Sequence, residues 1–137
     1  MERVMTVAFI GIELAKNVFQ LHGANADGQA VTKRRIRREG LLAEVAELEP
    51  CVIGVEACTG AFYWRRQFEA LGHRVKVIAP QYVKPFVKHQ TNDQNDAEAI
   101  CTALMLPNMK FVPTKSEEQQ DIQALHRARR RLVNHRT

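Results

Sequence analysis

The sequence predicts an α/β fold in which three antiparallel strands come first and strand–helix units follow. Two observations support this prediction. Apolar or alternating runs separated by turn residues fill the first 37 of the 137 residues. From residue 39 onward, apolar residues recur at helical spacing, interrupted by two short apolar runs. The expected order, β-β-β-α-β-α-β-α-α, gives a mixed five-stranded sheet with helices on both faces.

The three N-terminal strands are expected at residues 5–13, 18–22 and 29–37. Residues 7–12 form the continuous apolar run VAFIGI, which is typical of a strand buried on both faces. Residues 18–22 alternate between apolar and polar side chains. The sequence NADG at residues 25–28 is a hairpin turn signal, so the second and third strands should be antiparallel neighbours.

Helices and strands are expected to alternate in the rest of the chain. Glycine and proline residues mark the ends of these elements, since Pro50 cannot continue a helix and Gly72 accepts the geometry of a helix C-cap. The expected helices are residues 39–49, 60–71 and 80–87, a fourth from Asp93 or Asp96 to Leu106, and a last one from Ser116. The expected strands are residues 51–56 and 74–78.

The composition describes a soluble globular domain of a cytosolic protein. The chain is 45% hydrophobic and 26% charged, and no apolar stretch approaches the roughly 18 residues that cross a membrane. Cys51, Cys58 and Cys101 lack CxxC spacing, which indicates reduced and mostly buried thiols. The net charge of +5, concentrated in residues 33–38 and 126–136, favours a polyanionic partner.

Four carboxylates stand where predicted strands end or a helix begins. Glu13 and Glu56 each follow an apolar run, and Asp93 and Asp96 share one face of a helix start. Each has an ordinary structural explanation, such as a helix N-cap for Asp93 or Asp96. Together they indicate a two-metal site that cleaves or joins phosphodiesters, because carboxylates suit Mg²⁺ and ligands gather at the carboxyl ends of strands. Mn²⁺ is the expected substitute ion.

Basic side chains near this site and at the C-terminus are candidate nucleic-acid contacts. Lys84, Lys88 and His89 lie near the proposed acidic site and could meet a scissile phosphate. Four arginines of the C-terminal tail could bind phosphates, although a solvated helix face is the alternative. They are Arg127, Arg129, Arg130 and Arg131.

Other side chains support further expectations. Leu125, Leu132 and Val133 of the last helix would need a partner, which predicts a homo-oligomer. Trp64 and Tyr63 are expected to pack in the core rather than to stack on bases. Residues Cys58, Cys101, His73 and His89 fit no zinc-finger spacing, so a zinc site is not expected.

Four segments of the chain resemble the N-terminal domain of the DEDD transposases of the insertion-sequence-110 family, which includes the Piv invertase. They are FIGIELAKNVF (9–19), GVEACTG (54–60), APQYVKPFV (79–87) and NDQNDAEAI (92–100). The resemblance covers nearly the whole chain and implies a ribonuclease-H-like, RuvC-like fold. Its DEDD positions fall on Glu13, Glu56, Asp93 and Asp96.

The same resemblance implies a function and partners. It implies Mg²⁺-dependent strand cleavage and joining in DNA transposition, carried out in the bacterial cytoplasm without a membrane partner. It also implies contact with a structured RNA that bridges target and donor DNA.

Two features depart from the family pattern. The family usually has aspartate where this chain has Glu13. The extra methylene group of glutamate moves the carboxylate, and Mg²⁺ demands near-ideal geometry. Glu13 could therefore still act as a ligand, or it could disable the site. Family members continue into a C-terminal domain that supplies a serine nucleophile, whereas the single serine here is Ser116. We therefore expect residues 1–114 to be the catalytic domain and residues 115–137 to begin a basic helix leading to an absent domain.

Two other functions remain open. A truncated, inactive nucleic-acid-binding or dimerisation fragment would retain salt-sensitive binding without a metal. A sugar-kinase or actin-like ATPase begins with a similar hairpin, but it requires a glycine- and threonine-rich phosphate loop where this chain has Ala15-Lys16-Asn17.

Overall fold

One mixed sheet of five strands organises the molecule, in the order β3-β2-β1-β4-β5. The computed structural model describes residues 6–88 and 93–113. The strands pair antiparallel from β1 to β2 to β3, while β4 runs parallel to β1 and β5 runs parallel to β4. They are β1 (Phe9–Glu13), β2 (Val18–Ala24), β3 (Ala30–Arg37), β4 (Val52–Glu56) and β5 (Arg74–Ile78). The predicted mixed five-stranded sheet is confirmed.

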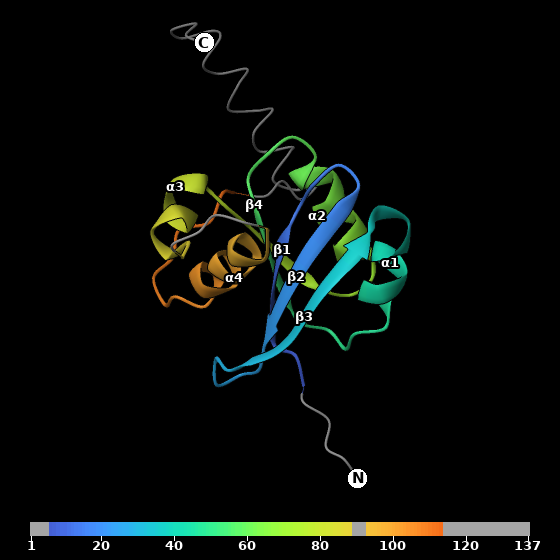
Figure 1. Cartoon of the computed structure of the whole chain (residues 1–137), viewed down its shortest axis with the longest axis horizontal. Coiled ribbons are helices and arrows are strands. Elements are labelled where there is room, and N and C mark those ends of the chain that lie inside the picture. The colour runs from blue at the N-terminus through green and yellow to red at the C-terminus, as the bar shows by residue number, and fades with distance from the viewer. Residues whose placement is uncertain (1–5, 89–92, 114–137) are drawn as a thin grey trace, which may run out of the picture.

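Helices cover both faces of this sheet (Figure 1). Because successive strand residues point to opposite faces, Ile10, Ile12 and their counterparts in the other strands join one core, while the residues between them face the other way. The first core lies under α1 (Arg38–Ala46) and α2 (Ala61–Ala70). The second lies under α3 (Pro80–Val83), the 3₁₀ turn η1 (Lys84–Phe86) and α4 (Asp93–Leu104).

The ends of several elements differ from the prediction. β1 begins at Phe9, later than expected. α1 ends at Ala46 and α4 at Leu104, both earlier than expected. After α1 the N–H groups bond to carbonyls three residues back, and after α4 the N–H of Met105 is shared between the carbonyls of Thr102 and Cys101, so both helices close with tighter turns. The predicted helix from Ser116 lies outside the described residues. No described helix is long and apolar enough to cross a membrane.

α4 packs closely on the sheet because glycine occupies the contact in both central strands. Gly11 and Gly54 are register partners in the parallel β1–β4 pair. A Cβ atom at Gly11 would lie 2.4 Å from the carbonyl oxygen of Ala97 and 2.5 Å from the amide nitrogen of Cys101, both backbone atoms of α4. A Cβ at Gly54 would meet only side chains of α4, the nearest at 3.2 Å. Gly11 therefore sets how near the helix comes to the strand.

We expect Gly11→Ala to lower the free energy of unfolding by about 3 kcal/mol, because a methyl group pressed against helix backbone forces the two elements apart. Urea denaturation measures this change. Gly40→Ala in α1 is the control, because its Cβ would meet Ile36 Cγ2 at an ordinary 3.7 Å. That variant should gain roughly 0.5–1 kcal/mol from the better helix propensity of alanine. Equal stability of the two variants would contradict the close contact at Gly11.

Candidate active site

Glu13 and Glu56 lie side by side at the carboxyl ends of parallel strands. Ile12 and Val55 are register partners, and Glu13 and Glu56 are the next residues of their strands. The two-residue alternation also places both glutamates on the face of Gly11 and Gly54, which is the face that α4 covers. Both side chains are partly buried. The two carboxylates are therefore brought together because their strands pair and because both side chains point to the same face of the sheet.

α4 brings a third carboxylate to the same edge. Asp96 directly precedes Ala97, whose carbonyl oxygen lies against Gly11. Asp96 and Glu56 line one cavity of about 390 Å³. Asp93 is the first residue of α4, one helical turn before Asp96, but its side chain lies outside the described part of the structure.

Burial, together with a neighbouring carboxylate, raises the free energy of the ionised form of Glu56. Burial raises the pKa of Glu56, the charge of Asp96 raises it further, and the ammonium group of Lys84 lowers it. Burial also raises the pKa of the Cys58 thiol, with smaller increases from Glu56 and Glu13. Glu13, Glu56 and Asp96 thus share one electrostatic environment, and crowded carboxylates of this kind are stabilised when a cation arrives.

Lys84 and Lys88 line the same cavity as Glu56 and Asp96, together with two valine side chains. Lys88 Nζ lies 3.1 Å from Glu98 Oε2, an ion pair that holds the lysine against α4. The structure therefore places both lysines beside the carboxylates, and contact with a phosphate stays a prediction. His89 and the four predicted arginines of the tail lie outside the described residues; these are Arg127, Arg129, Arg130 and Arg131.

No complete metal cluster is formed by the described side chains alone. Among residues 6–88 and 96–113, no three histidine, cysteine, aspartate or glutamate side chains come close enough to hold an ion. His73 is committed elsewhere, because its Nδ1 accepts a hydrogen bond from the Cys51 N–H at 3.1 Å and its Nε2 lies 3.0 Å from the Val45 carbonyl oxygen. These contacts lie at the start of β4, whereas Glu56 lies at its end.

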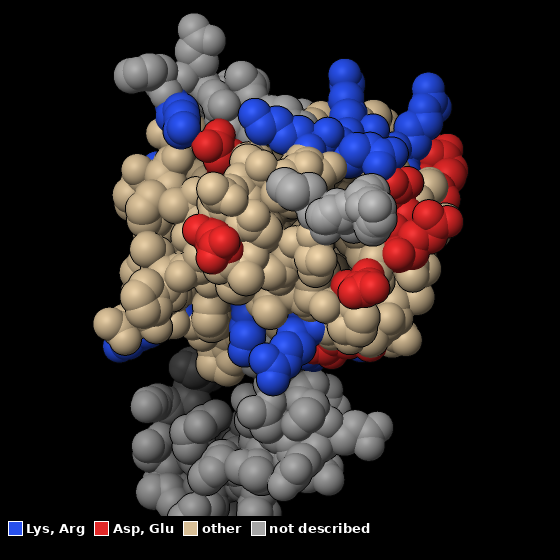
Figure 2. Space-filling model, turned by 90° about the horizontal axis from the view of Figure 1, so that it is seen from below, with Lys and Arg blue, Asp and Glu red and all other residues tan. Residues whose placement is uncertain are grey.

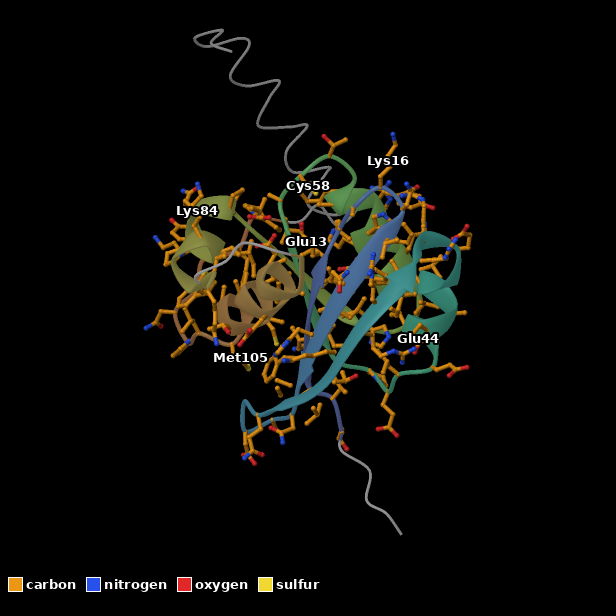
Figure 3. All side chains as sticks on the ribbon, viewed as in Figure 1. Glu13, Lys16, Glu44, Cys58, Lys84 and Met105 are labelled. Atoms are coloured by element: carbon orange, nitrogen blue, oxygen red, sulfur yellow. The ribbon has the colours of Figure 1, made fainter. Side chains whose placement is uncertain are left out.

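The candidate site occupies one end of the sheet. In Figure 3, Lys84, Glu13, Cys58 and Lys16 follow one another across the upper end of the molecule. Figure 2 views the molecule from below, where lysine and arginine side chains form a band along one side with acidic side chains beside it. Charges of both signs therefore occur away from the site, and the net charge of +5 alone does not locate a nucleic-acid surface.

Of the two aromatic residues Tyr63 and Trp64, both expected to pack in the core, only Trp64 does so. Trp64 is buried, with 6% exposure, but Tyr63 is 45% exposed. Neighbouring residues of a helix point about 100° apart, so both cannot face one core. The buried residues Ala61, Trp64 and Phe68 follow the i, i+3, i+7 spacing of an amphipathic helix, and this spacing could have placed Tyr63 outside.

The fold resembles that of one solved structure. The chain is similar to the solved structure of T. thermophilus RuvC in complex with a Holliday junction substrate, with a TM-score of 0.55 and 13% sequence identity. The match covers 69% of this chain and 90% of RuvC. At this identity the likeness shows the fold alone, and it confirms the predicted RuvC-like class.

The sequence identifies the family. The model of the DEDD transposases of the insertion-sequence-110 type, described as a transposase, matches residues 10–137. The chain is 47% identical over 133 residues to a probable family 20 transposase of Pseudomonas aeruginosa, and 45% identical over 130 residues to the transposase for insertion sequence element IS1328 of Yersinia enterocolitica. The chain belongs to the DEDD transposases of the insertion-sequence-110 family.

These relatives are longer than the chain. The two matches cover 97% and 95% of this chain but 39% of each relative. A third relative, the transposase for insertion sequence element IS1111A of Coxiella burnetii, is 44% identical over 131 residues, which cover 36% of its length. The chain thus corresponds to a little over one third of a transposase.

We expect Glu56→Gln to raise the melting temperature at pH 7 in the absence of divalent cations by roughly 2–4 °C. The raised pKa of Glu56 means that the folded state favours its protonated form. Its stabilising contribution is therefore present at low pH and is lost as the pH rises through the folded pKa. The gain from the substitution should disappear near pH 3, below the usual glutamate pKa of roughly 4.3.

Thermal denaturation followed by circular dichroism at both pH values measures this effect. Glu47→Gln is the control, because Glu47 is exposed at the end of α1, which packs on the opposite face of the sheet from α4. A gain that is the same at pH 3 and pH 7 would show that the charge of Glu56 is not its cause.

Proposed function

We propose that this chain is the metal-dependent DNA-cleaving domain of a transposase, in which Glu13, Glu56, Asp93 and Asp96 hold two Mg²⁺ ions. Mn²⁺ would substitute. The observation that carries the proposal is the cavity shared by Glu56 and Asp96 at the carboxyl ends of the central strands. Membership of the transposase family supports cleavage and joining of DNA strands as the reaction.

The donor set fits the proposed ions. Carboxylate oxygens are the ligands that Mg²⁺ prefers. The raised pKa of Glu56, caused by burial and by the charge of Asp96, shows that ionised Glu56 is disfavoured in this environment, and a bound cation would favour the ionised form. When bound, two ions would stabilise the attacking and leaving oxygens of a phosphodiester displacement.

The chain's own residues would hold the substrate beside these ligands. Lys84 and Lys88 place two ammonium groups on the wall of the same cavity, where they would attract a phosphate. Lys84 also lowers the pKa of Glu56 and so favours the ionised form that a metal requires. Val83 and Val87 form apolar parts of the wall.

The remaining parts of the proposal concern the whole transposase. Residues 1–114 would be the catalytic domain, and the basic residues of 115–137 would lead to a C-terminal domain that supplies the serine nucleophile. The tail arginines would contact DNA or a structured RNA. A homo-oligomer would cover the apolar residues of the helix that the sequence predicts from Ser116.

A second function is binding of nucleic acid without cleavage, by an inactive fragment. One observation favours it. The first ligand position is Glu13 rather than aspartate. Metal binding separates this function from the first one.

We expect the chain to bind Mn²⁺, and Asp96→Asn to weaken this binding at least tenfold, because changing even a residue that only supports a metal ligand typically costs roughly 10–100-fold in affinity. Isothermal titration calorimetry measures both affinities. Asp27→Asn is the matched control, because Asp27 is exposed in the β2–β3 turn. Absence of Mn²⁺ binding by the parent, or equal loss in both variants, would contradict a metal site at Asp96 and favour the non-cleaving function.

A further inference from the structure

We propose that a second cavity, on the α2 side of the carboxylates, binds a backbone phosphate of the nucleic-acid strand that continues past the reacting bond. The cavity measures about 620 Å³ and lies between the β1–β2 loop, the start of α1 and the start of α2. The proposal rests on the proposed function for the identity of the strand. The inference that a phosphate binds in this cavity is argued from the residues that line it.

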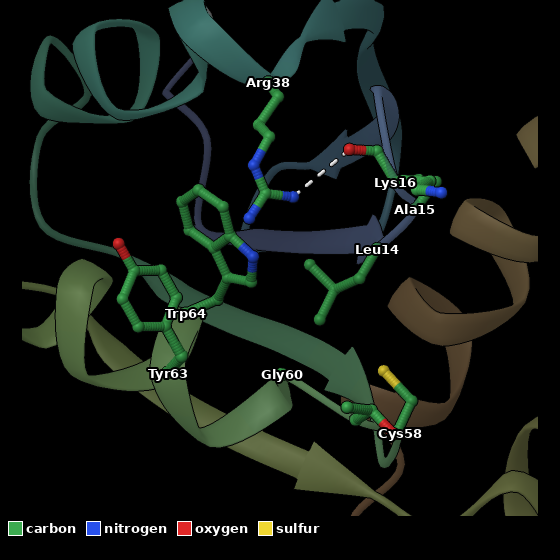
Figure 4. Close-up of a pocket in the computed structure, with 9 residues that line it drawn as sticks. Leu14, Ala15, Lys16, Arg38, Cys58, Gly60, Tyr63 and Trp64 are labelled. Atoms are coloured by element: carbon green, nitrogen blue, oxygen red, sulfur yellow. Dashed lines mark hydrogen bonds between the residues drawn. The ribbon is translucent and has the colours of Figure 1, made fainter.

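The polar side chains of this cavity are hydrogen-bond donors suited to an anion. Lys16 and Arg38 supply two positive charges, and Thr59 adds a hydroxyl group. The indole ring of Trp64 turns its nitrogen toward the hollow in the close-up (Figure 4). None of the described residues that line this cavity is an aspartate or a glutamate. Its charge is therefore opposite to that of the neighbouring carboxylate cluster.

Arg38 is held in place before any ligand arrives. Its Nη1 donates a hydrogen bond of 3.2 Å to the carbonyl oxygen of Lys16, drawn as a dashed line in Figure 4. Its guanidinium carbon lies 5.3 Å from the ring centroid of Trp64 and 6.0 Å from that of Phe19. Trp64 is itself fixed by stacking on Phe68, with centroids 5.7 Å apart. A preorganised arginine loses little entropy on binding a phosphate.

These contacts explain Arg38 as a structural residue, but they do not explain Lys16. The Lys16 side chain is exposed, and Figure 3 shows it projecting from the upper end of the molecule. Only the backbone carbonyl of Lys16 takes part in the bond to Arg38. The ammonium group therefore adds charge to the rim of the cavity without a described role in the fold.

The cavity adjoins the carboxylate cluster. Cys58 lines it, and the charges of Glu56 and Glu13 contribute, after burial, to the raised pKa of the same thiol. Lys84 and Lys88 lie on the other side of the carboxylates, in the cavity of Glu56 and Asp96. In Figure 3, Lys84 and Lys16 stand at opposite sides of Glu13. A strand crossing this edge would meet positive charge on both sides of the reacting bond, and this arrangement would fix its position.

Trp64 is the single tryptophan of the chain, so a change in tryptophan fluorescence reports on this cavity. The 137-residue chain is titrated in EDTA with a 12-nucleotide single-stranded DNA, and Trp64 emission is followed. The expected result is a saturable change in emission. Lys16→Ala should raise Kd at least threefold and reduce the slope of log K against log salt by about 0.7, the effect of one lost phosphate contact on a single strand.

Lys110→Ala is the matched control, because Lys110 is an exposed lysine that lines neither of the two cavities. It should leave the titration unchanged. RNA of the same sequence identifies the source of the phosphate, since the tighter of the two strands is the natural ligand. An equal emission change with inorganic phosphate alone would overturn the assignment to a strand.

Three further results would overturn the proposal: no binding of either strand, binding of a labelled strand without any change in Trp64 emission, or unaltered affinity in Lys16→Ala. The titration in EDTA needs no metal. A chain that fails to bind Mn²⁺ but passes this test would lose the proposed cleavage function and keep the phosphate cavity.

Discussion

The close contact between the backbone of α4 and Gly11 is the constraint on which the candidate site depends. α4 carries Asp96, while β1 and β4 carry Glu13 and Glu56, so the separation of the three carboxylates is set by the height of the helix above the sheet. The buried face of α4 is made largely of small side chains, including Ala97, Ala99 and Ala103, each fully buried. Small residues on both sides of the contact allow α4 to lie close to the sheet.

The two faces of the sheet divide stability and chemistry between them. The core under α1 and α2 contains Trp64, whose ring contacts the rings of both Phe19 and Phe68. Aromatic side chains contribute strongly to core stability. The core under α4 is smaller and is interrupted at its end by charged groups whose burial is unfavourable, as the raised pKa of Glu56 shows. The larger and more aromatic core therefore lies on the face of the sheet away from the charged groups.

Much of this arrangement could be predicted from the sequence, because it follows from local rules. Apolar runs located β1 and β4, and the position of Glu13 and Glu56 directly after them placed both at strand ends. The Lys16–Arg38 cavity could not be predicted in this way. Lys16 and Arg38 are separated in sequence by the whole β2–β3 hairpin. They meet because the hairpin brings the chain back to the β1–β2 loop, where the Arg38 N–H donates a hydrogen bond of 2.8 Å to the Asn17 carbonyl oxygen. Contacts made by a returning chain depend on register, which no single segment encodes.

The outer edges of the sheet also limit how copies of this domain associate. β3 forms one edge, and it exposes four cationic side chains, Lys33, Arg34, Arg35 and Arg37. A second β3 laid alongside would be repelled by them. At the other edge, Val112 already bridges to Val77 of β5. Within the described residues, one edge therefore repels its own copies and the other is partly covered, so continuous edge-to-edge growth of this sheet into fibres is disfavoured.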